Sequence, residues 1–219
     1  MKKLVIFDLD GTLLDTIEDL GNATNYALRT LGYPERKREE LYGMVGRGIT
    51  NLLRAALPEG CDTEETVARI RNHFMEHYAV HLCDRTHPYP GIPELLEHLT
   101  ERNVRFSVAS NKYQEGAETV VRHFFGQYPV VTVLGQREGF PIKPDPGIVD
   151  LCIREAGVTK KEVLYVGDSD VDMHTGLNAG VDTVGVTWGF RSRGELERCG
   201  PLAVVDSPTE LEAFILGGA

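Results

Sequence analysis

Short apolar segments alternate with segments of helical periodicity along most of this chain, and this alternation restricts the possible fold more than any other feature. The apolar segments are 3–7, 104–109, 130–134, 163–166, 183–186 and 203–205. The helical segments are 92–100, 114–125, 146–156, 171–179 and 208–216. A continuous apolar run is typical of a strand buried on both faces. The order therefore predicts an α/β fold, with a doubly wound parallel sheet covered by helices on both faces.

Residues 16–85 interrupt the alternation. They show helical periodicity and no strand pattern, and segments that contain Gly and Pro separate the helices at 32–34 and 58–60. We therefore expect two parts: a core formed by residues 1–15 and 86–219, and an inserted α-helical cap at residues 16–85. The two joints, near Asp15 and Arg85, would act as hinges.

Charge and cysteine content narrow the class of protein. Lys plus Arg is 23 and Asp plus Glu is 33, which gives a formal net charge of −10. An acidic surface repels polyphosphate backbones, so we expect no nucleic-acid partner. The four cysteines form no CxxC pair, and no apolar segment is long enough for a signal peptide core or a membrane span. These features predict a cytoplasmic protein with no membrane partner, and they leave monomer or homodimer open.

Polar side chains follow four of the apolar segments, at the ends where open parallel sheets bind ligands. In chain order these candidates are Asp8 and Asp10, then Ser110, Asn111 and Lys112, then Lys143, then Asp168 and Asp172. Carboxylates that converge on one point repel each other by several kcal/mol unless a cation offsets them. Oxygen ligands of this kind suit Mg²⁺. A phosphoryl group bound beside the metal would explain Lys143, and Ser110 could donate to one of its oxygens.

The chain resembles the haloacid dehalogenase superfamily of phosphohydrolases over essentially its whole length. The matching motifs are Asp8-Leu9-Asp10-Gly11-Thr12-Leu13, Ser110-Asn111, Lys143-Pro144-Asp145-Pro146 and Gly167-Asp168-Ser169-x-x-Asp172. The resemblance implies a Rossmann-like core with an α-helical cap inserted after the first motif. Residues 185–190 are similar to the phosphoglycolate phosphatase branch of this superfamily.

The resemblance also implies roles for the motif residues. Asp8 would be the nucleophile that takes the phosphoryl group, and Asp10 would be the general acid and then the general base. Ser110 and Lys143 would hold the phosphate during catalysis. The metal would be Mg²⁺, and its site would be formed by Asp8, the backbone carbonyl of Asp10, Asp168 and, in a supporting role, Asp172.

The substrate implied is a small phosphorylated metabolite, with 2-phosphoglycolate as the leading candidate. Asn111, Lys112 and Arg47 are further candidates for substrate binding, Arg47 because flanking glycines place it on a cap loop. A phosphomutase similar to beta-phosphoglucomutase and a pyrophosphatase remain alternatives on the same scaffold. Dehalogenases lack an acid at the position of Asp10, which counts against that activity.

Three histidines, His73, His77 and His81, share one face of the last expected cap helix. This spacing could suggest a metal site. We interpret them as a polar helix face, because no acidic residue accompanies them in a catalytic pattern.

Overall fold

Six parallel strands form the central sheet of the computed structural model, which describes residues 2–217. Their order across the sheet is β5-β4-β1-β6-β7-β8, and every neighbouring pair is parallel. The strands are β1 (Leu4–Phe7), β4 (Arg105–Tyr113), β5 (Val130–Gln136), β6 (Val163–Gly167), β7 (Asp182–Val186) and β8 (Ala203–Val205). The expected α/β fold with a doubly wound parallel sheet is therefore confirmed.

Helices cover both faces of this sheet, and β1 shows why. Its residues are all buried, and Val5 and Phe7 pack into one apolar cluster while Leu4 and Ile6 pack into another. The first cluster includes residues of α5 (Ile92–Glu101), α6 (Gln114–Phe125) and α10 (Pro208–Gly217). The second includes residues of α7 (Gly147–Ala156) and α8 (Asp170–Ala179), and α9 (Arg193–Arg198) packs beside α8. Successive side chains of a strand point to opposite faces, so a run that is apolar throughout serves both layers.

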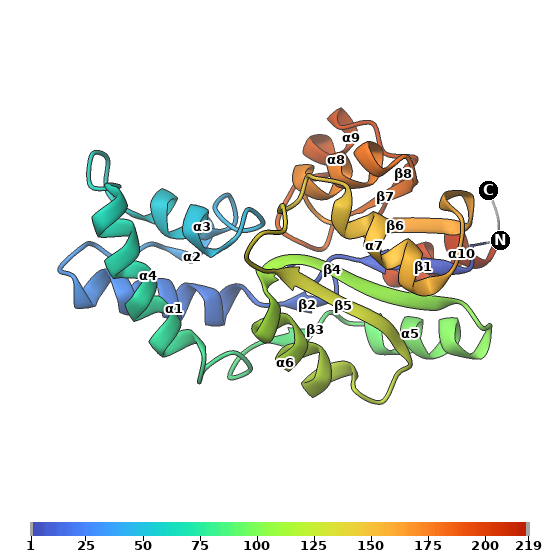
Figure 1. Ribbon diagram of the computed structural model, residues 1–219, viewed down its shortest axis with the longest axis horizontal. Helices are drawn as coiled ribbons and strands as arrows, with labels where there is room; N and C mark the ends of the chain where they lie inside the picture. The colour runs from blue at the N-terminus through green and yellow to red at the C-terminus, as the bar shows by residue number, and fades with distance from the viewer. Residues whose placement is uncertain (1, 218–219) are drawn as a thin grey trace.

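Within residues 2–217, four helices precede α5, and they lie apart from the sheet, at the end of the molecule opposite the two chain termini (Figure 1). They are α1 (Ile17–Thr30), α2 (Arg38–Leu41), α3 (Ile49–Ala56) and α4 (Glu64–Tyr78). Apolar residues of α1, such as Leu20 and Ala27, pack with Ile70 and Phe74 of α4. The last of these helices ends at Tyr78, so His81, which was expected to lie on it, lies beyond its end. The chain tightens just beyond that end: the N–H of Ala79 still bonds four residues back, to Met75, whereas those of Val80 and His81 bond to carbonyls only three residues back.

The two chain segments that join these helices to the sheet lie side by side. They form an antiparallel pair of short strands, β2 (Leu14–Asp15) and β3 (His87–Pro88). The buried carboxylate of Asp19, in the first turn of α1, accepts bonds from the backbone of Arg85 and from the backbone and hydroxyl of Thr86, at 2.8–3.1 Å. The two connecting segments are therefore paired with each other, and the second is also hydrogen-bonded to α1.

The strand β4 is longer than the apolar pattern predicted. It continues past residue 109 to Tyr113, so Ser110, Asn111 and Lys112 lie within the strand and not after it. Pairing with β5 shifts in this stretch: β4 advances four residues, from 109 to 113, while β5 advances two, from 134 to 136. The extra residues form an irregularity of the kind that redirects side chains at the end of a strand. Among residues 2–217, no helix is both long enough and apolar enough to cross a bilayer.

Candidate active site

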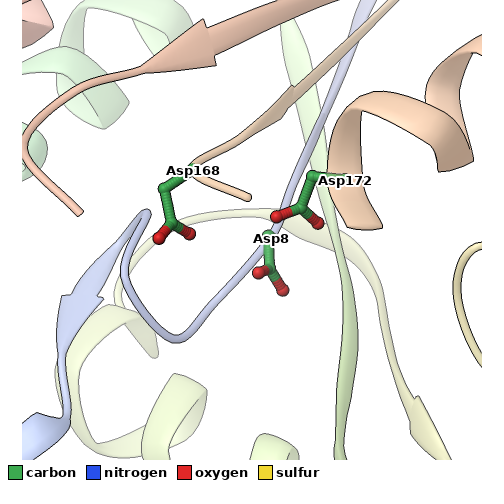
Figure 2. A group of neighbouring side chains, drawn as sticks. All are labelled: Asp8, Asp168 and Asp172. Atoms are coloured by element: carbon green, nitrogen blue, oxygen red, sulfur yellow. The ribbon is translucent and has the colours of Figure 1, made fainter. Parts of the chain in front are cut away.

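Three carboxylates converge at the carboxyl ends of neighbouring strands (Figure 2). Asp8 directly follows β1, Asp168 directly follows β6, and Asp172 lies in the first turn of α8. One oxygen of each lies within 4.8 Å of the others. Their residues are only 5%, 1% and 0% exposed, respectively. The sequence prediction that these three side chains meet is therefore consistent with the structure.

Asp172 is oriented by the start of α8. Ser169 caps this helix, and its hydroxyl and backbone N–H donate to Asp172 Oδ2 at 2.5 and 3.1 Å. This reciprocal arrangement is a capping box. It leaves Asp172 Oδ1 facing the site, where it accepts bonds from Lys143 Nζ and from the Tyr165 hydroxyl at 2.7 and 3.1 Å.

Lys143 is the buried cation of the site. Its Nζ lies 2.8 Å from Asp8 Oδ1, and it donates to Asp172 Oδ1, to the Ala109 carbonyl at 3.1 Å and to the Tyr165 hydroxyl at 3.2 Å. The contact with Asp8 is an ion pair without the angles of a hydrogen bond. Burial lowers the pKa of Lys143, but the Asp172 and Asp8 carboxylates outweigh it and hold this pKa well above its ordinary value. Lys143 therefore stays charged beside Asp8.

Asp168 is held by two donors. Its Oδ1 accepts from the Thr12 hydroxyl at 3.0 Å, and its Oδ2 accepts from the Phe190 N–H at 2.7 Å. Burial and the carboxylate of Asp172 raise the pKa of Asp168 to about 7, although these two bonds lower it.

Two glycines make room for the Asp168 carboxylate. A β-carbon at Gly189 would overlap this carboxylate and the Gly11 carbonyl, and a β-carbon at Gly11 would overlap the same carboxylate. Gly11 also has a φ of +90°, which other residues rarely adopt. The loops after β1 and β7 thus pass so close to the Asp168 carboxylate that only glycine fits at positions 11 and 189.

The residues fit a divalent cation. One ammonium faces three buried carboxylates, so the group is net negative when all three are ionised. Asp8 Oδ1 is buried and accepts no hydrogen bond from any described residue. Burial and the carboxylates of Asp172 and Asp168 raise the pKa of Asp8 well above its ordinary value, although Lys143 lowers it. Such a set of oxygen ligands suits Mg²⁺, and a bound Mg²⁺ would offset the repulsion among the three carboxylates.

A pocket opens beside Asp8, between the sheet and the helices α1–α4. Its polar side comes from Asp8, Asp10, Ser110, Asn111 and Lys112. Its apolar side comes from α1, from α3 and from the loop before α3, and it includes Leu20, Val45, Ile49 and Leu52. The cavity measures about 30 Å³. The pocket is therefore small, because each water molecule needs roughly 10–15 Å³ of such space.

Ser110 and Asn111 lie close to the other site residues but differ in their bonding. The Ser110 hydroxyl accepts from the backbone N–H of Lys112 at 3.1 Å and keeps its own proton available. The Asn111 amide donates to the carbonyls of Gly46 and Lys143 at 3.0 and 3.2 Å, and it accepts from the Lys143 N–H at 2.9 Å. Asn111 therefore joins the loop of Gly46 to the segment that carries Lys143.

Asp10 lies outside the three-carboxylate group, on the pocket side. Its Oδ1 accepts a 3.1 Å bond from Lys112 Nζ. The same ammonium donates to the hydroxyl of Tyr78 at 2.5 Å, and the side chain of Lys112 is only 2% exposed. Tyr78 lines the pocket, but nothing in the sequence singled it out. It follows Phe74 by four residues in an apolar helical pattern, so it has the spacing of an ordinary core residue.

Arg47 is the one predicted site residue that the structure separates from the rest. Its guanidinium pairs with Asp170 Oδ2 at 2.5 Å. It lines a second pocket, of about 530 Å³, together with Arg191 and Arg198. The glycines on either side, Gly46 and Gly48, do line the pocket at Asp8. The loop therefore reaches the site as expected, while its arginine turns to the outside.

Comparison with known proteins identifies the family. Residues 5–186 match the family described as haloacid dehalogenase-like hydrolase. The chain belongs to this family.

A phosphoglycolate phosphatase of Vibrio parahaemolyticus is 34% identical over 95% of this chain and 94% of its own. An N-acetylmuramic acid 6-phosphate phosphatase of Pseudomonas aeruginosa is 30% identical over 95% of this chain and 92% of its own. A crystal structure from Lactobacillus delbrueckii subsp. bulgaricus superposes with a TM-score of 0.92 at 34% identity, and covers 99% of this chain and 100% of that one. The resemblance to the superfamily and to its phosphoglycolate phosphatase-like branch is confirmed.

In this haloacid dehalogenase-like hydrolase, a second residue that the sequence analysis missed holds the helices against the core. Arg191, after β7, donates to the carbonyls of Tyr42 and Val45, the latter at 3.0 Å. Both acceptors lie between α2 and α3. Since an arginine that bonds to backbone carbonyls needs no particular partner side chain, no motif marks this contact.

The three histidines lie on α4 and just beyond it, and none of them lines the pocket at Asp8. The rings of His77 and His81 stack at 4.3 Å, and His77 also stacks on Tyr26 at 4.6 Å. Burial lowers the pKa of His77. Within residues 2–217, the acidic group at Asp8 is the one cluster of possible metal ligands, so the interpretation of these histidines as a polar helix face is consistent with the structure.

Proposed function

We propose that this chain is a Mg²⁺-dependent phosphatase that hydrolyses a small phosphate monoester through an aspartyl-phosphate on Asp8. The phosphatase class follows from the family and from the relatives, which are phosphatases over nearly the whole length of the chain. The observation that carries the proposal is the position of Lys143 Nζ, 2.8 Å from Asp8 and 2.7 Å from Asp172, beside a pocket that contains Asp8. A fixed cation at that point favours an ionised carboxylate and an incoming anion together.

Bond formation at phosphorus is assigned to Asp8. Its carboxylate attacks the phosphorus atom, the bond from phosphorus to the ester oxygen breaks, and the phosphoryl group passes to Asp8. Lys143 reduces the repulsion between the two anions, and the Ser110 hydroxyl donates to a phosphoryl oxygen. A bound Mg²⁺, held by Asp8, the Asp10 carbonyl and Asp168 with support from Asp172, would further neutralise the charge on the phosphoryl group.

Proton transfer is assigned to Asp10. In the first step it gives a proton to the ester oxygen as the alcohol leaves. In the second step it takes a proton from the water that attacks the phosphorus of the aspartyl-phosphate, which releases inorganic phosphate and restores the Asp8 carboxylate. Asp10 lies two residues after Asp8 and lines the same pocket, which supports this division of roles.

Residues 16–85 are proposed to act as a cap that opens and closes on the core of residues 1–15 and 86–219. The paired joints of β2 and β3 support this proposal, because a movement of α1–α4 about them would require few other backbone changes. Closure would exclude bulk water from the aspartyl-phosphate.

The leading substrate is 2-phosphoglycolate. The small pocket and the phosphoglycolate phosphatases among the relatives support it. A carboxylate on the substrate needs a cation, and Arg47 is engaged with Asp170. Lys112 is the better candidate, because its ammonium lines the pocket and has three donors, of which Asp10 and Tyr78 take two.

A matched pair of esters tests this proposal: ethyl phosphate has a methyl group where 2-phosphoglycolate has its carboxylate. We expect Mg²⁺-dependent release of phosphate, with kcat/KM about 10–100-fold higher for 2-phosphoglycolate. N-Acetylmuramic acid 6-phosphate serves as the larger competitor. Equal kcat/KM for the first two esters would contradict the substrate, and undiminished activity in EDTA would contradict the metal. Steady release of phosphate with no bisphosphate cofactor would exclude the phosphomutase alternative.

A further inference from the structure

Tyr78 is a residue of the helices α1–α4 whose functional group reaches a core side chain at the site. It is the last residue of α4 and is fully buried. Its ring packs on Phe74 at 5.0 Å and meets Tyr113 edge to face at 6.4 Å. These contacts fix the direction of the hydroxyl, which lies 2.5 Å from Lys112 Nζ.

Among the described residues, the ammonium of Lys112 has two hydrogen-bond partners, and they come from different parts of the chain. Asp10 belongs to the loop after β1, and Tyr78 belongs to α4. Burial raises the pKa of Tyr78 well above its ordinary value, so the phenol keeps its proton and its oxygen accepts from the ammonium. A lysine side chain is long and flexible, and a buried ammonium needs each of its acceptors. The Tyr78 oxygen therefore restricts where Lys112 can place its bond to Asp10.

We propose that Tyr78 is a positioning residue for proton transfer: its hydroxyl holds Lys112 against Asp10, so that Asp10 is aligned with the ester oxygen only while α4 lies against the core. This inference rests on the proposed function, because it concerns the acid step assigned to Asp10. Closure of α1–α4 on the core and alignment of Asp10 would then occur together. An open enzyme would then bind phosphate at Lys143 and Ser110 but would protonate the leaving alcohol poorly.

The test is the substitution Tyr78→Phe, which keeps the ring and removes the oxygen. Two substrates separate alignment of the acid from other defects. Ethyl phosphate, an alkyl ester without a carboxylate for Lys112 to bind, needs a proton on its leaving oxygen, whereas p-nitrophenyl phosphate releases a stable anion and does not. The parameter to compare is kcat/KM, because it reports the steps up to release of the alcohol. We expect kcat/KM of the Tyr78→Phe enzyme to fall about 10-fold or more for the alkyl ester, within the range of general acid catalysis, and to change less than about 3-fold for the aryl ester.

Tyr113→Phe is the matched control. Its ring touches that of Tyr78, and its hydroxyl makes no hydrogen bond among the described residues. We expect both esters to react with it at the wild-type rate. An equal loss on the two esters with Tyr78→Phe, or no loss on either, would overturn the proposal, because a general packing defect does not distinguish leaving groups.

A second variant keeps the inference testable if Tyr78→Phe folds poorly. Lys112→Met removes the ammonium and should lower the ratio of alkyl to aryl kcat/KM in the same direction. Adding Tyr78→Phe to Lys112→Met should change that ratio no further, since the hydroxyl would act through the lysine. Additive losses would contradict the proposal. If the wild-type enzyme hydrolysed the esters but Asp8→Asn did so equally well, the proposed function would fail, whatever the ratio measured for Tyr78→Phe.

Discussion

The guanidinium of Arg191 donates to the carbonyl of Val45 over 3.0 Å and thereby fastens the loop between α2 and α3 to the core. The side chain of Arg191 is only 9% exposed and also bonds to the Tyr42 carbonyl. Val45 itself lines the pocket at Asp8. The contact therefore joins the wall of the pocket to the segment that supports Asp168.

The substitution Arg191→Ala should release this loop. Hydrogen bonds from a charged donor contribute about 1.5–3 kcal/mol each when they are buried, so we expect kcat/KM to fall at least about 10-fold. Small-angle scattering with a phosphate mimic such as beryllofluoride should show a more extended particle than the wild type. Arg193→Ala is the control, because its pairs with Glu197 and Asp206 lie on the surface and should contribute little. Wild-type activity in Arg191→Ala would contradict the role of this contact.

Gly189→Ala should weaken the proposed metal site although it replaces none of the proposed ligands. Its β-carbon would overlap the Asp168 carboxylate and force that side chain to move. We expect the affinity for Mg²⁺, measured by calorimetry, to fall about 10–100-fold. Gly194→Ala is the matched control, since the nearest atom to a β-carbon there would be 3.7 Å away. Unchanged Mg²⁺ affinity in Gly189→Ala would show that Asp168 is not a ligand, or is not constrained by this loop.

The stability of the metal-free protein should depend on pH through Asp168. Its pKa is about 7 in the folded chain, against 3.8 when unperturbed. The folded state therefore binds more protons than the unfolded state between these values, so this group makes folding less favourable as pH rises from about 4 to 7. In EDTA, Asp168→Asn should lose less thermal stability over that range than the wild type. At pH 8, Mg²⁺ should raise the melting temperature of the wild type alone, since binding to the folded state stabilises it. Parallel curves for the two proteins would contradict this account.

Asp19→Ala should destabilise the joint between α1 and β3. The carboxylate accepts bonds from Arg85 and Thr86 in a buried position, and its removal leaves those donors unpaired. We expect the free energy of unfolding in a denaturant titration to fall by about 2–4 kcal/mol. The neighbouring Glu18→Ala is the control, because that side chain is 53% exposed and its contact with Arg38 is 3.9 Å long. A loss no larger than that of Glu18→Ala would mean that the joint does not depend on Asp19.

The sequence predicted the sheet and the central site for the same physical reason. Residues such as Ile6 and Val166 lie in runs that are apolar throughout, which only a strand buried on both faces requires. Polar residues such as Asp8 and Asp168 then stand out where those runs end. The short strands β2 and β3 were not predictable, because two residues each carry no periodicity.

Contacts between the two ends of the molecule were beyond sequence reasoning. The direction of Arg47 depends on Asp170, 123 residues away, and flanking glycines indicate a loop without indicating where its side chain points. Tyr78 has the sequence spacing of a core residue, and only the contact of its hydroxyl with Lys112 distinguishes it from one. Such roles depend on which side chains the folded chain brings together.

The most direct test of the central claim is to identify the residue that carries the phosphoryl group. The Asp10→Asn enzyme should be mixed with p-nitrophenyl phosphate and Mg²⁺, quenched in acid and treated with borohydride, which reduces an acyl phosphate to an alcohol. The aryl ester needs no acid to form the intermediate, whereas its hydrolysis needs the missing base, so the intermediate should accumulate. We predict that mass spectrometry will find homoserine at position 8, only when substrate was present. An unmodified Asp8, or modification at another carboxylate, would contradict the account.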